Sequence, residues 1–266
     1  SASLRLENIT WGTNGFTAHL MIFPVDLSGN TFTLSVLCKD GTTYRYTTPQ
    51  IGKKYVAGMR YTATITGDKW TESSTTETLT GSTQIADKFA SGTGYDDDPY
   101  LISTAEELLL MQKKVNDGSY NDYRLTTDIK IADDVTWVPI GTDYSNRFQG
   151  SFDGGGHTIS GTLRGNNPYF GFFGCVDSNI RNLRIAATVT NNYDDASQCC
   201  TGGVAGFFTA DYGRHTLYRC SYKGSVTGGK TKGTSNENYT GGLVGQCQNT
   251  ILSGCTVEAG SKVTGG

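Results

Sequence analysis

The sequence has few prolines, no long hydrophobic run and no excess of one charge. It contains 5 Pro in 266 residues, 18% charged residues and a formal net charge of −3. This charge balance excludes the basic surface that nucleic-acid binding requires, so we expect no nucleic acid as a partner. No apolar segment approaches the roughly 20 residues of a membrane-spanning helix. The N-terminal residues also lack the features of a signal peptide, and we expect a mature or truncated chain.

The sequence also lacks cysteine pairs with the spacing of a zinc site. None of its 7 Cys has C-x-x-C spacing, which argues against a zinc site. Small buried apolar side chains are the simplest interpretation of an odd number of cysteines, and disulfides are the alternative for a secreted protein. Cys220 and Cys255 are then the first pair to test. The others are Cys38, Cys175, Cys199, Cys200 and Cys247.

Glycine is the residue that the sequence has in abundance. The 35 Gly, with frequent Ser, Thr, Asn and Tyr, favour short strands joined by tight turns over helices. Residues 1–71 contain at least five runs that alternate with period two, separated by turn signals such as Thr13-Asn14-Gly15 and Asp40-Gly41. This pattern predicts an antiparallel β-sandwich over residues 1–71.

The composition changes twice after this region. Residues 72–95 are rich in Ser, Thr and Gly and poor in apolar residues, which predicts a linker. Ser103 and Glu106 then have the spacing of a capping box, an apolar stripe follows, and Asn116-Asp117-Gly118 ends it. We therefore expect one α-helix near residues 103–116. An amphipathic helix at this place would cover the exposed first turn of a β-solenoid.

The residues after this helix contain short runs bounded by Asp, Gly or Asn. YRLTTDIKI, VTWVPIGT and RFQGSFDGGGHTISGTL are each expected to be strand-forming. The Gly-rich segments FGFFG, GGVAG and GGLVG then recur, and a supersecondary unit repeated at this scale predicts a solenoid. Aligning the repeats predicts three buried ladders. They are Ile180, Leu217 and Leu252; Leu183, Cys220 and Cys255; and Val189, Val226 and Val263.

The first part of the chain resembles a known family. FPVDLSGNTFTLSVLCKDGTTYRYTTPQIGKKYVAGMRYTATITGDKW is similar to the C-terminal part of fimbrillin-like domains of Bacteroidetes surface proteins. The shared features are a strand ending at Pro24, a central strand leading into an Asp-Gly turn, and a closing Thr/Ile strand. Such domains normally have more chain before this point, so we expect an incomplete module.

A second resemblance covers roughly residues 92–266. GTGYDDDPYLISTAEELLLM, LTTDIKI, WVPIGT, FQGSFDGGGHTISG and FFG resemble the entry segment of bacterial surface β-helices with the GLUG motif. The strict Gly-Leu-x-Gly form occurs at Gly242–Gly245, and Gly203–Gly206 and Gly171–Gly174 are variants. The resemblance implies a right-handed β-helix over residues 96–266 with the helix at its N-terminal end. The expected fold class of the whole chain is all-β.

Few residues indicate chemistry. Asp96, Asp97 and Asp98 could supply oxygen ligands to calcium, but their spacing is not that of an EF-hand, and a solvated turn is the simpler interpretation. Asp153 and His157 in FDGGGHT could form an acid/base pair, although a His in a Gly-rich turn more often hydrogen-bonds the backbone of that turn. We expect no metal ion and no cofactor.

Parallel β-helices include polysaccharide lyases and hydrolases, which need paired carboxylates or a carboxylate with a base. No acid of the repeats recurs with a basic partner at an equivalent position, so we expect no enzyme. The acids are Asp177, Asp194, Asp195 and Asp211, and the scattered arginines are Arg181, Arg184, Arg214 and Arg219.

Tyrosines are the better indication of ligand binding, because aromatic faces suit both sugar rings and protein contacts. The alternative is that they stack on one another along the coil as ordinary surface ladders. The candidates are Tyr193, Tyr212, Tyr218, Tyr222 and Tyr239.

Both resemblances imply a non-catalytic adhesion or stalk protein on the cell surface of a Bacteroidetes-like bacterium, at the extracellular face of the outer membrane. Its expected partner is a host or microbial surface protein or glycan. Membrane association is expected only through a lipid anchor absent from this chain. A carbohydrate-binding surface module is the first alternative, and a polysaccharide-degrading β-helix enzyme is the second.

Overall fold

The computed structural model describes residues 76–195, 198–232 and 237–266, together with the backbone of five short strands before them. The chain divides into two compact units, residues 1–74 and 75–266. In the first unit, β1 (Thr10–Gly12) pairs antiparallel with β2 (Gly15–Thr17). The antiparallel pairing agrees with the alternating pattern. The sandwich stays a prediction, because Asp40-Gly41 and much of this unit lie outside the described residues. The remaining strands, paired antiparallel in the order β3-β4-β5, are β3 (Thr33–Leu37), β4 (Thr43–Thr47) and β5 (Thr71–Glu72).

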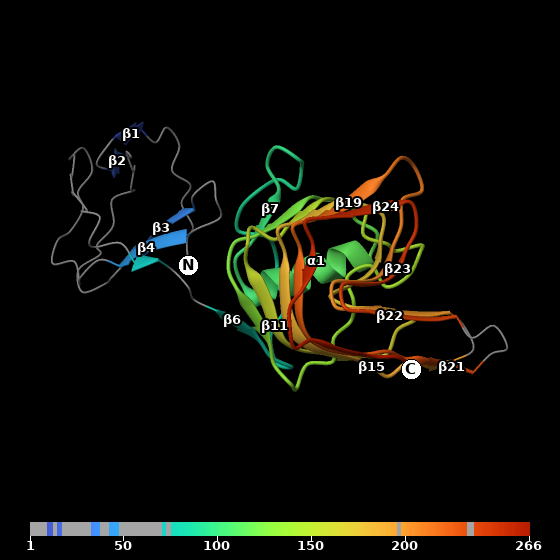
Figure 1. Cartoon of the computed structure of the whole chain (residues 1–266). Coiled ribbons are helices and arrows are strands. Elements are labelled where there is room, and N and C mark those ends of the chain that lie inside the picture. Colours follow the sequence, from blue (N-terminus) through green and yellow to red (C-terminus); the bar gives the residue numbers. More distant parts are fainter. Residues whose placement is uncertain are drawn as a thin grey trace. The chain divides into compact units, whose positions relative to one another are not determined.

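The second unit consists of parallel strands that join each sheet in the order in which they occur in the sequence (Figure 1). One sheet has the order β6-β9-β11-β15-β20-β25, with β26 also beside β20, and another has the order β7-β8-β10-β14-β19-β24. The smaller sheets are β12-β17-β22, β13-β18-β23 and β16-β21. Among the described strands, none of these sheets closes on itself. The all-β class is therefore confirmed at this level, and the right-handed β-helix stays a prediction.

The strands of the two large sheets have the following bounds. The first sheet contains β6 (Glu77–Leu79), β9 (Ile129–Ile131), β11 (Thr158–Gly165), β15 (Arg184–Asn191), β20 (Ser221–Thr227), β25 (Thr256–Val257) and β26 (Lys262–Thr264). The second contains β7 (Tyr100–Ile102), β8 (Tyr123–Leu125), β10 (Phe152–Asp153), β14 (Ile180–Arg181), β19 (His215–Tyr218) and β24 (Thr250–Ser253).

The strands of the smaller sheets come from the Gly-rich segments and the connections beside them. They are β12 (Tyr169–Phe170), β13 (Phe173–Val176), β16 (Asp194–Asp195), β17 (Cys199–Gly202), β18 (Ala205–Phe208), β21 (Lys230–Thr231), β22 (Asn238–Gly241) and β23 (Val244–Cys247).

The register of the sheets places equivalent residues of successive repeats side by side. The register of two predicted ladders is confirmed by direct pairing, Ile180–Leu217–Leu252 and Val189–Val226–Val263. Their predicted burial is wrong for the last members, since Leu252 and Val263 are 43% and 47% exposed. The third is supported by its neighbours, because Leu183, Cys220 and Cys255 each immediately precede one of the paired residues Arg184, Ser221 and Thr256. Leu183 and Cys220 are 1% exposed, whereas Cys255 is only partly buried. Cys255 is less covered because it belongs to the last described repeat.

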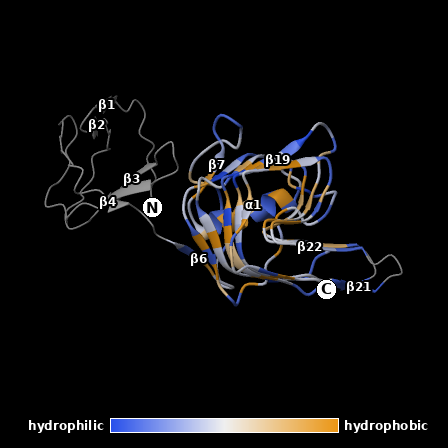
Figure 2. Ribbon diagram, in the orientation of Figure 1, coloured by the Kyte–Doolittle hydropathy of each residue, from blue (hydrophilic) through white to orange (hydrophobic). Residues whose placement is uncertain are grey.

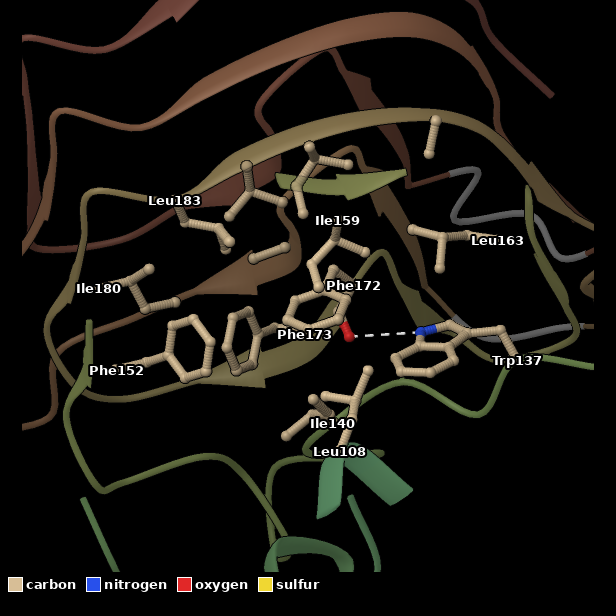
Figure 3. Packing of buried hydrophobic residues seen from close by; sticks show 14 of the residues in the cluster. Leu108, Trp137, Ile140, Phe152, Ile159, Leu163, Phe172, Phe173, Ile180 and Leu183 are labelled. Carbon is tan, nitrogen blue, oxygen red and sulfur yellow. Dashed lines mark hydrogen bonds between the residues drawn. The ribbon is translucent and has the colours of Figure 1, made fainter. Parts of the chain in front are cut away.

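The inward-facing side chains form a continuous apolar core (Figure 3). Trp137 stacks on Phe172 with ring centroids 5.4 Å apart, and Phe152 packs edge to face on Phe173 at 5.3 Å. The indole N–H of Trp137 donates to the carbonyl of Gly171 at 3.0 Å, so this buried polar group is satisfied. Figure 2 shows hydrophobic residues distributed along the stacked strands and along the helix that packs against them.

Helix α1 (Ala105–Asn116) is the one helix among the described residues, and it ends where the sequence predicts, with Gly118 at φ 92°. Its N-cap is Thr104 rather than Ser103, because the Thr104 hydroxyl accepts the N–H of Glu107 at 3.2 Å. The Glu107 carboxylate in turn accepts the N–H of Ser103 at 2.7 Å. The predicted capping interaction is therefore present, but one residue later in the chain.

Helix α1 packs beside β6 and β7, which are the first strands of the two large sheets. Its side chains Leu108, Met111 and Val115 are fully buried and belong to the same core as the strands. In Figure 1 the helix lies within the outline of the stacked strands. This is the position that the sequence predicts for a helix covering the first strands.

Two expectations about local structure are wrong. Part of the predicted linker is strand β6, which pairs with β9 and buries Leu79 to 1% exposure. The composition concealed this strand, because Leu79 is the only large apolar residue of β6 and the segment around it is rich in Ser, Thr and Gly. VTWVPIGT contains only an isolated bridge at Ile140 instead of a strand. Pro139 in this run lacks the N–H that a sheet ladder needs.

The repeated glycines lie where backbones approach closely. Gly174, Gly206 and Gly245 end the three Gly-rich segments, and their neighbours pair in register. A Cβ atom on Gly206 would lie 2.4 Å from the backbone nitrogen of Phe170, and one on Gly245 would lie 2.6 Å from that of Thr201. Both distances are too short for a side-chain carbon. Close packing of neighbouring backbones therefore accounts for the last glycine of each segment.

Six cysteines are free thiols in the described part of the chain, and Cys38 lies outside it. Four of the six are buried, in agreement with the interpretation as small core side chains. Over the same described residues, no helix has the length and apolarity to cross a bilayer.

Candidate functional site

The strongest grouping of ionisable side chains lies where the segment before the repeats meets two successive repeats. Phe148 forms a parallel bridge with Val176, and Thr209 donates its N–H to the Val176 carbonyl at 2.8 Å. These backbone contacts bring together residues that are far apart in the sequence. We call the group the Arg147 cluster, and it consists of Tyr144, Arg147, Asp177, Asp211 and His215.

Arg147 is the centre of this cluster. Its Nε lies 3.0 Å from Oδ2 of Asp177, and its guanidinium also contacts Oδ2 of Asp211 at 2.8 Å. His215 Nε2 lies 3.0 Å from the other Asp177 oxygen, which also accepts the backbone N–H of Asp211 at 3.2 Å. The Tyr144 hydroxyl is a hydrogen-bond partner of Asp211, and the Arg147 guanidinium lies 4.5 Å from the Tyr144 ring centroid. One arginine thus joins acids from two successive repeats.

The contacts of Asp177 in the Arg147 cluster favour its ionised form. Burial alone would raise the pKa of Asp177, whose side chain is only 7% exposed, but the hydrogen bond from Arg147 and the N–H of Asp211 outweigh it and lower that pKa. The hydrogen bond to Asp211 raises the pKa of Tyr144. A general acid needs a carboxyl group that is still protonated near neutral pH. The environment of Asp177 has the opposite effect, and it suits a cross-link between repeats.

Two tyrosines leave an aromatic surface beside these charges. Tyr144 is 46% exposed and hydrogen-bonded to Asp211. Tyr212, which follows Asp211 in the chain, is 91% exposed. Exposed rings beside hydrogen-bonding groups suit both sugars and protein surfaces. Of the five predicted tyrosines, only Tyr212 lies beside this cluster.

The other predicted tyrosines do not gather into one surface. Tyr222 is fully buried, because it pairs with the inward-facing Ile185 and its hydroxyl donates to the Ala187 carbonyl at 2.9 Å. Tyr239 is partly buried against the cluster of Cys175, Cys200 and Phe207, and Tyr193 is also partly buried. Tyr218 is 38% exposed and lies under the Arg219 guanidinium at 4.9 Å. The prediction of a binding role for Tyr222 is therefore wrong.

Asp153 and His157, which could be an acid/base pair by sequence, have different partners. Asp153 accepts hydrogen bonds from Asn182 and from the Gly155 N–H, both at 3.0 Å, and pairs with Arg181 at 3.1 Å. Burial alone would raise the pKa of Asp153, but these three contacts outweigh burial and lower that pKa. His157 Nδ1 lies 3.2 Å from Asp128. Both side chains thus hold the Gly-rich turn in place.

Other predicted charges form local ion pairs. Asp194 of β16 pairs with Lys232, the residue after the neighbouring strand β21, at 2.8 Å. Arg184 pairs with Glu258 at 3.1 Å. Asp195 and Arg214 are both exposed.

The three consecutive aspartates Asp96, Asp97 and Asp98 lie in a tight turn. The N–H of Asp98 donates to the Tyr95 carbonyl at 2.9 Å, and the Asp98 carbonyl accepts the N–H of Thr93 at 2.9 Å. Within the described residues, no group of three or more His, Cys, Asp or Glu is arranged to hold a metal ion.

Sequence reasoning missed the Arg147 cluster because Arg147 and Tyr144 lie before the aligned repeats. Asp177 and Asp211 are also 34 residues apart, whereas the repeat offsets are 35 and 39. The available signal was the FDGGGHT segment, which follows Arg147 closely in the sequence.

Comparisons with known proteins find partial similarity. The chain is 35% identical over 106 residues to a protein of Evansella cellulosilytica provisionally described as a Gly-rich membrane protein, covering 36% of this chain and 12% of that protein. It is 30% identical over 175 residues to halomucin of Haloquadratum walsbyi, covering 61% of this chain and 2% of halomucin. No family model and no solved structure matches. The chain is thus similar to short segments of two much longer proteins.

Proposed function

We propose that this chain is a non-catalytic adhesion or stalk module of a cell surface, with its second unit wound as a right-handed β-helix. The observation that carries the proposal is the register, which aligns equivalent residues of successive repeats in parallel ladders. In such an arrangement each added repeat extends the same sheets and the same core. The outer residues are then free to vary, which suits a rigid support for surface contacts.

The surface location is supported by the relatives and by the resemblances to Bacteroidetes surface proteins. The Evansella protein is described as a membrane protein, and this chain corresponds to a small part of it. The proposed partner is a protein or glycan on a host or microbial surface. Attachment to the membrane is proposed to depend on a lipid anchor outside this sequence.

The charges around Asp177 support a non-catalytic role. Both carboxylates of the Arg147 cluster contact the same guanidinium, and the pKa of Asp177 is lowered. Proton donation to a glycosidic oxygen needs the reverse arrangement, a carboxyl group with a raised pKa. Turnover of an acidic polysaccharide by the purified chain, lost in Asp177→Asn, would overturn this part of the proposal.

The experiment that tests the proposal displays the chain on a non-adherent bacterium through an added anchor. The adhesion role predicts binding to host or microbial cells above the level of the anchor alone. The stalk role predicts that a variant with residues 203–241 duplicated carries a C-terminal epitope farther from the cell. Adherence no greater than that of cells with the anchor alone, together with an unchanged distance of the epitope from the cell, would contradict both roles.

A carbohydrate-binding module is the second candidate, favoured by the exposure of Tyr144, which is hydrogen-bonded to Asp211, and of Tyr212, which follows Asp211 in the chain. A glycan array with the purified chain tests it. Selective binding should be lost in Tyr212→Ala and kept in Tyr120→Ala, since Tyr120 is 69% exposed at a different place, between α1 and β8. Binding that both variants retain, or no binding at all, would leave the adhesion or stalk role as the only proposal.

A further inference from the structure

The described cysteines differ in the residues that lie beside them in the sheets. Cys220 and Cys255 occupy equivalent positions in successive repeats, since Ser221 pairs with Thr256 and the N–H of Thr256 donates to the Cys220 carbonyl at 3.0 Å. The other described thiols lie beside residues that are not cysteine. Their partners are Phe207 for Cys175, Asn238 for Cys199, Tyr169 and Tyr239 for Cys200, and Phe208 for Cys247.

The geometry of Cys220 and Cys255 suits a covalent bond. Neighbouring strands of a sheet lie about 4.8 Å apart, which falls within the range of roughly 4.4–6.8 Å between the Cα atoms of disulfide-bonded cysteines. The two side chains also have equivalent environments. Cys220 Sγ lies 3.9 Å from the Ile180 carbonyl, and Cys255 Sγ lies 3.2 Å from the carbonyl of Leu217, which is the ladder partner of Ile180. Both thiols therefore point the same way, one above the other.

We propose that Cys220 and Cys255 form a disulfide that fastens the last described repeat to the one before it. Access is the second observation in its favour. Cys220 is 1% exposed, but Cys255 is only partly buried and can meet a small oxidant from solvent. The proposal does not depend on the function proposed above, because it concerns only the two thiols and an oxidant.

The pKa shifts of the two thiols also favour a reaction that begins at Cys255. The hydrogen bond between the two thiols lowers the pKa of Cys255, and the same contact together with burial raises the pKa of Cys220. The thiolate is the form of cysteine that attacks a disulfide. Because Cys255 is also the more exposed of the two thiols, it is the attacking residue, and Cys220 is the residue that resolves the intermediate.

The reaction needs a two-electron oxidant, and a small disulfide such as oxidised glutathione supplies it. The Cys255 thiolate attacks one glutathione sulfur, so that a mixed disulfide forms and one glutathione thiolate leaves. Cys220 then loses its proton and attacks the Cys255 sulfur, which releases the second glutathione thiolate. The two protein thiols are oxidised, and the protons from both convert the leaving groups to two reduced glutathione molecules.

The test treats the reduced full chain with oxidised glutathione, quenches it with acid, and maps its peptides by mass spectrometry without reduction. A peptide linking Cys220 to Cys255 is expected in the wild type and in Cys247→Ser, and it should be missing in Cys255→Ser. The exposed Cys247 serves as the matched control, because it lies beside Phe208 and should take up only glutathione. A stable glutathione adduct on Cys255 with Cys220 still free, or a link from Cys255 to another cysteine, would overturn the proposal.

A second measurement follows the effect on the structure. The link should slow amide hydrogen exchange in β24, β25 and β26 by roughly tenfold or more relative to the reduced chain, because it restrains local opening of the last repeat. Reduction with dithiothreitol should restore the faster exchange. Equal slowing in oxidised Cys255→Ser would show that the effect does not come from this link and would contradict the proposal.

Discussion

Leu217 lies in register beside Ile180 in the parallel pair β14–β19, and both side chains are fully buried. The next member of the ladder, Leu252, is 43% exposed, because β24 is the edge strand of its sheet. Leu217 and Leu252 are thus the same residue type at equivalent positions, but only Leu217 is fully buried. Comparing the two therefore separates the contribution of stacking to stability from the contribution of residue type.

Replacing Leu217 with Ala should destabilise the second unit more than the same change at Leu252. Deletion of a fully buried Leu side chain costs about 2–5 kcal/mol, through lost burial and the cavity that remains. Leu252→Ala should cost about half of that or less, since much of its side chain already meets solvent. Urea unfolding followed by circular dichroism measures both changes. Equal losses would contradict the stacking order.

Gly206→Ala tests the explanation of the repeated glycines. The new Cβ would lie 2.4 Å from the Phe170 nitrogen, so two backbones must separate. We expect a loss of about 1–3 kcal/mol in the free energy of unfolding, as for other overpacked sites. Gly265→Ala is the control, because a Cβ there meets nothing within 4 Å. An unchanged unfolding midpoint for Gly206→Ala would refute the close approach.

Glu107→Ala should weaken the attachment of α1 to the residues before it. The Glu107 carboxylate, on a residue only 4% exposed, accepts the N–H groups of Ser103 at 2.7 Å and Ala90 at 2.8 Å. Leaving a buried donor without a partner costs about 1–3 kcal/mol. The exposed Glu106, which the capping-box spacing with Ser103 predicts as the capping residue, is the matched control. The thermal midpoint should fall clearly for Glu107→Ala and little for Glu106→Ala, and the reverse order would restore the original capping prediction.

The stability of the Arg147 cluster should depend on pH in a defined direction. The folded pKa of Asp177 is lower than its ordinary value near 3.8, so the stabilising contribution of this carboxylate is complete above that value. It is lost as the pH falls through the folded pKa. The stability difference between the wild type and Asp177→Asn should therefore be large at pH 7 and shrink below about pH 4.

Urea unfolding midpoints between pH 7 and pH 2.5 measure this difference. Asp97→Asn, a change at an exposed turn carboxylate, is the control and should follow the wild type across the range. A difference for Asp177→Asn that stays constant with pH would show that Asp177 makes no ionised contribution to the folded state.

The sequence predicts the stacked part of this fold well because its spacing is regular. Apolar residues such as Val189, Val226 and Val263 recur at equivalent positions, and a period of two fixes which residues face inward. The same period, counted back from Val226, places Tyr222 inward. Tyr222 was therefore predictable as a core residue.

The Arg147 cluster was not predictable in the same way. Arg147 belongs to an irregular turn before the repeats, and its contacts depend on where that turn places a long side chain. Strand β6 also escaped prediction, because its pairing with β9 gives order to a segment with little apolar content of its own. Both features depend on contacts between residues that are far apart in the sequence, and the local composition does not reveal such contacts.

The central claim is that successive repeats lie one strand apart in a single register. Spin labels on the ladder Arg164, Thr190, Thr227 and Thr264 test it most directly, with Cys247 and Cys255 replaced by Ser. Labelled pairs 190/227, 164/227 and 164/264 have backbone separations of about 5, 10 and 14 Å, which are one, two and three strand spacings. The stacked register predicts dipolar broadening that decreases in that order. Absent broadening for 190/227, or equal broadening for all three pairs, would contradict it.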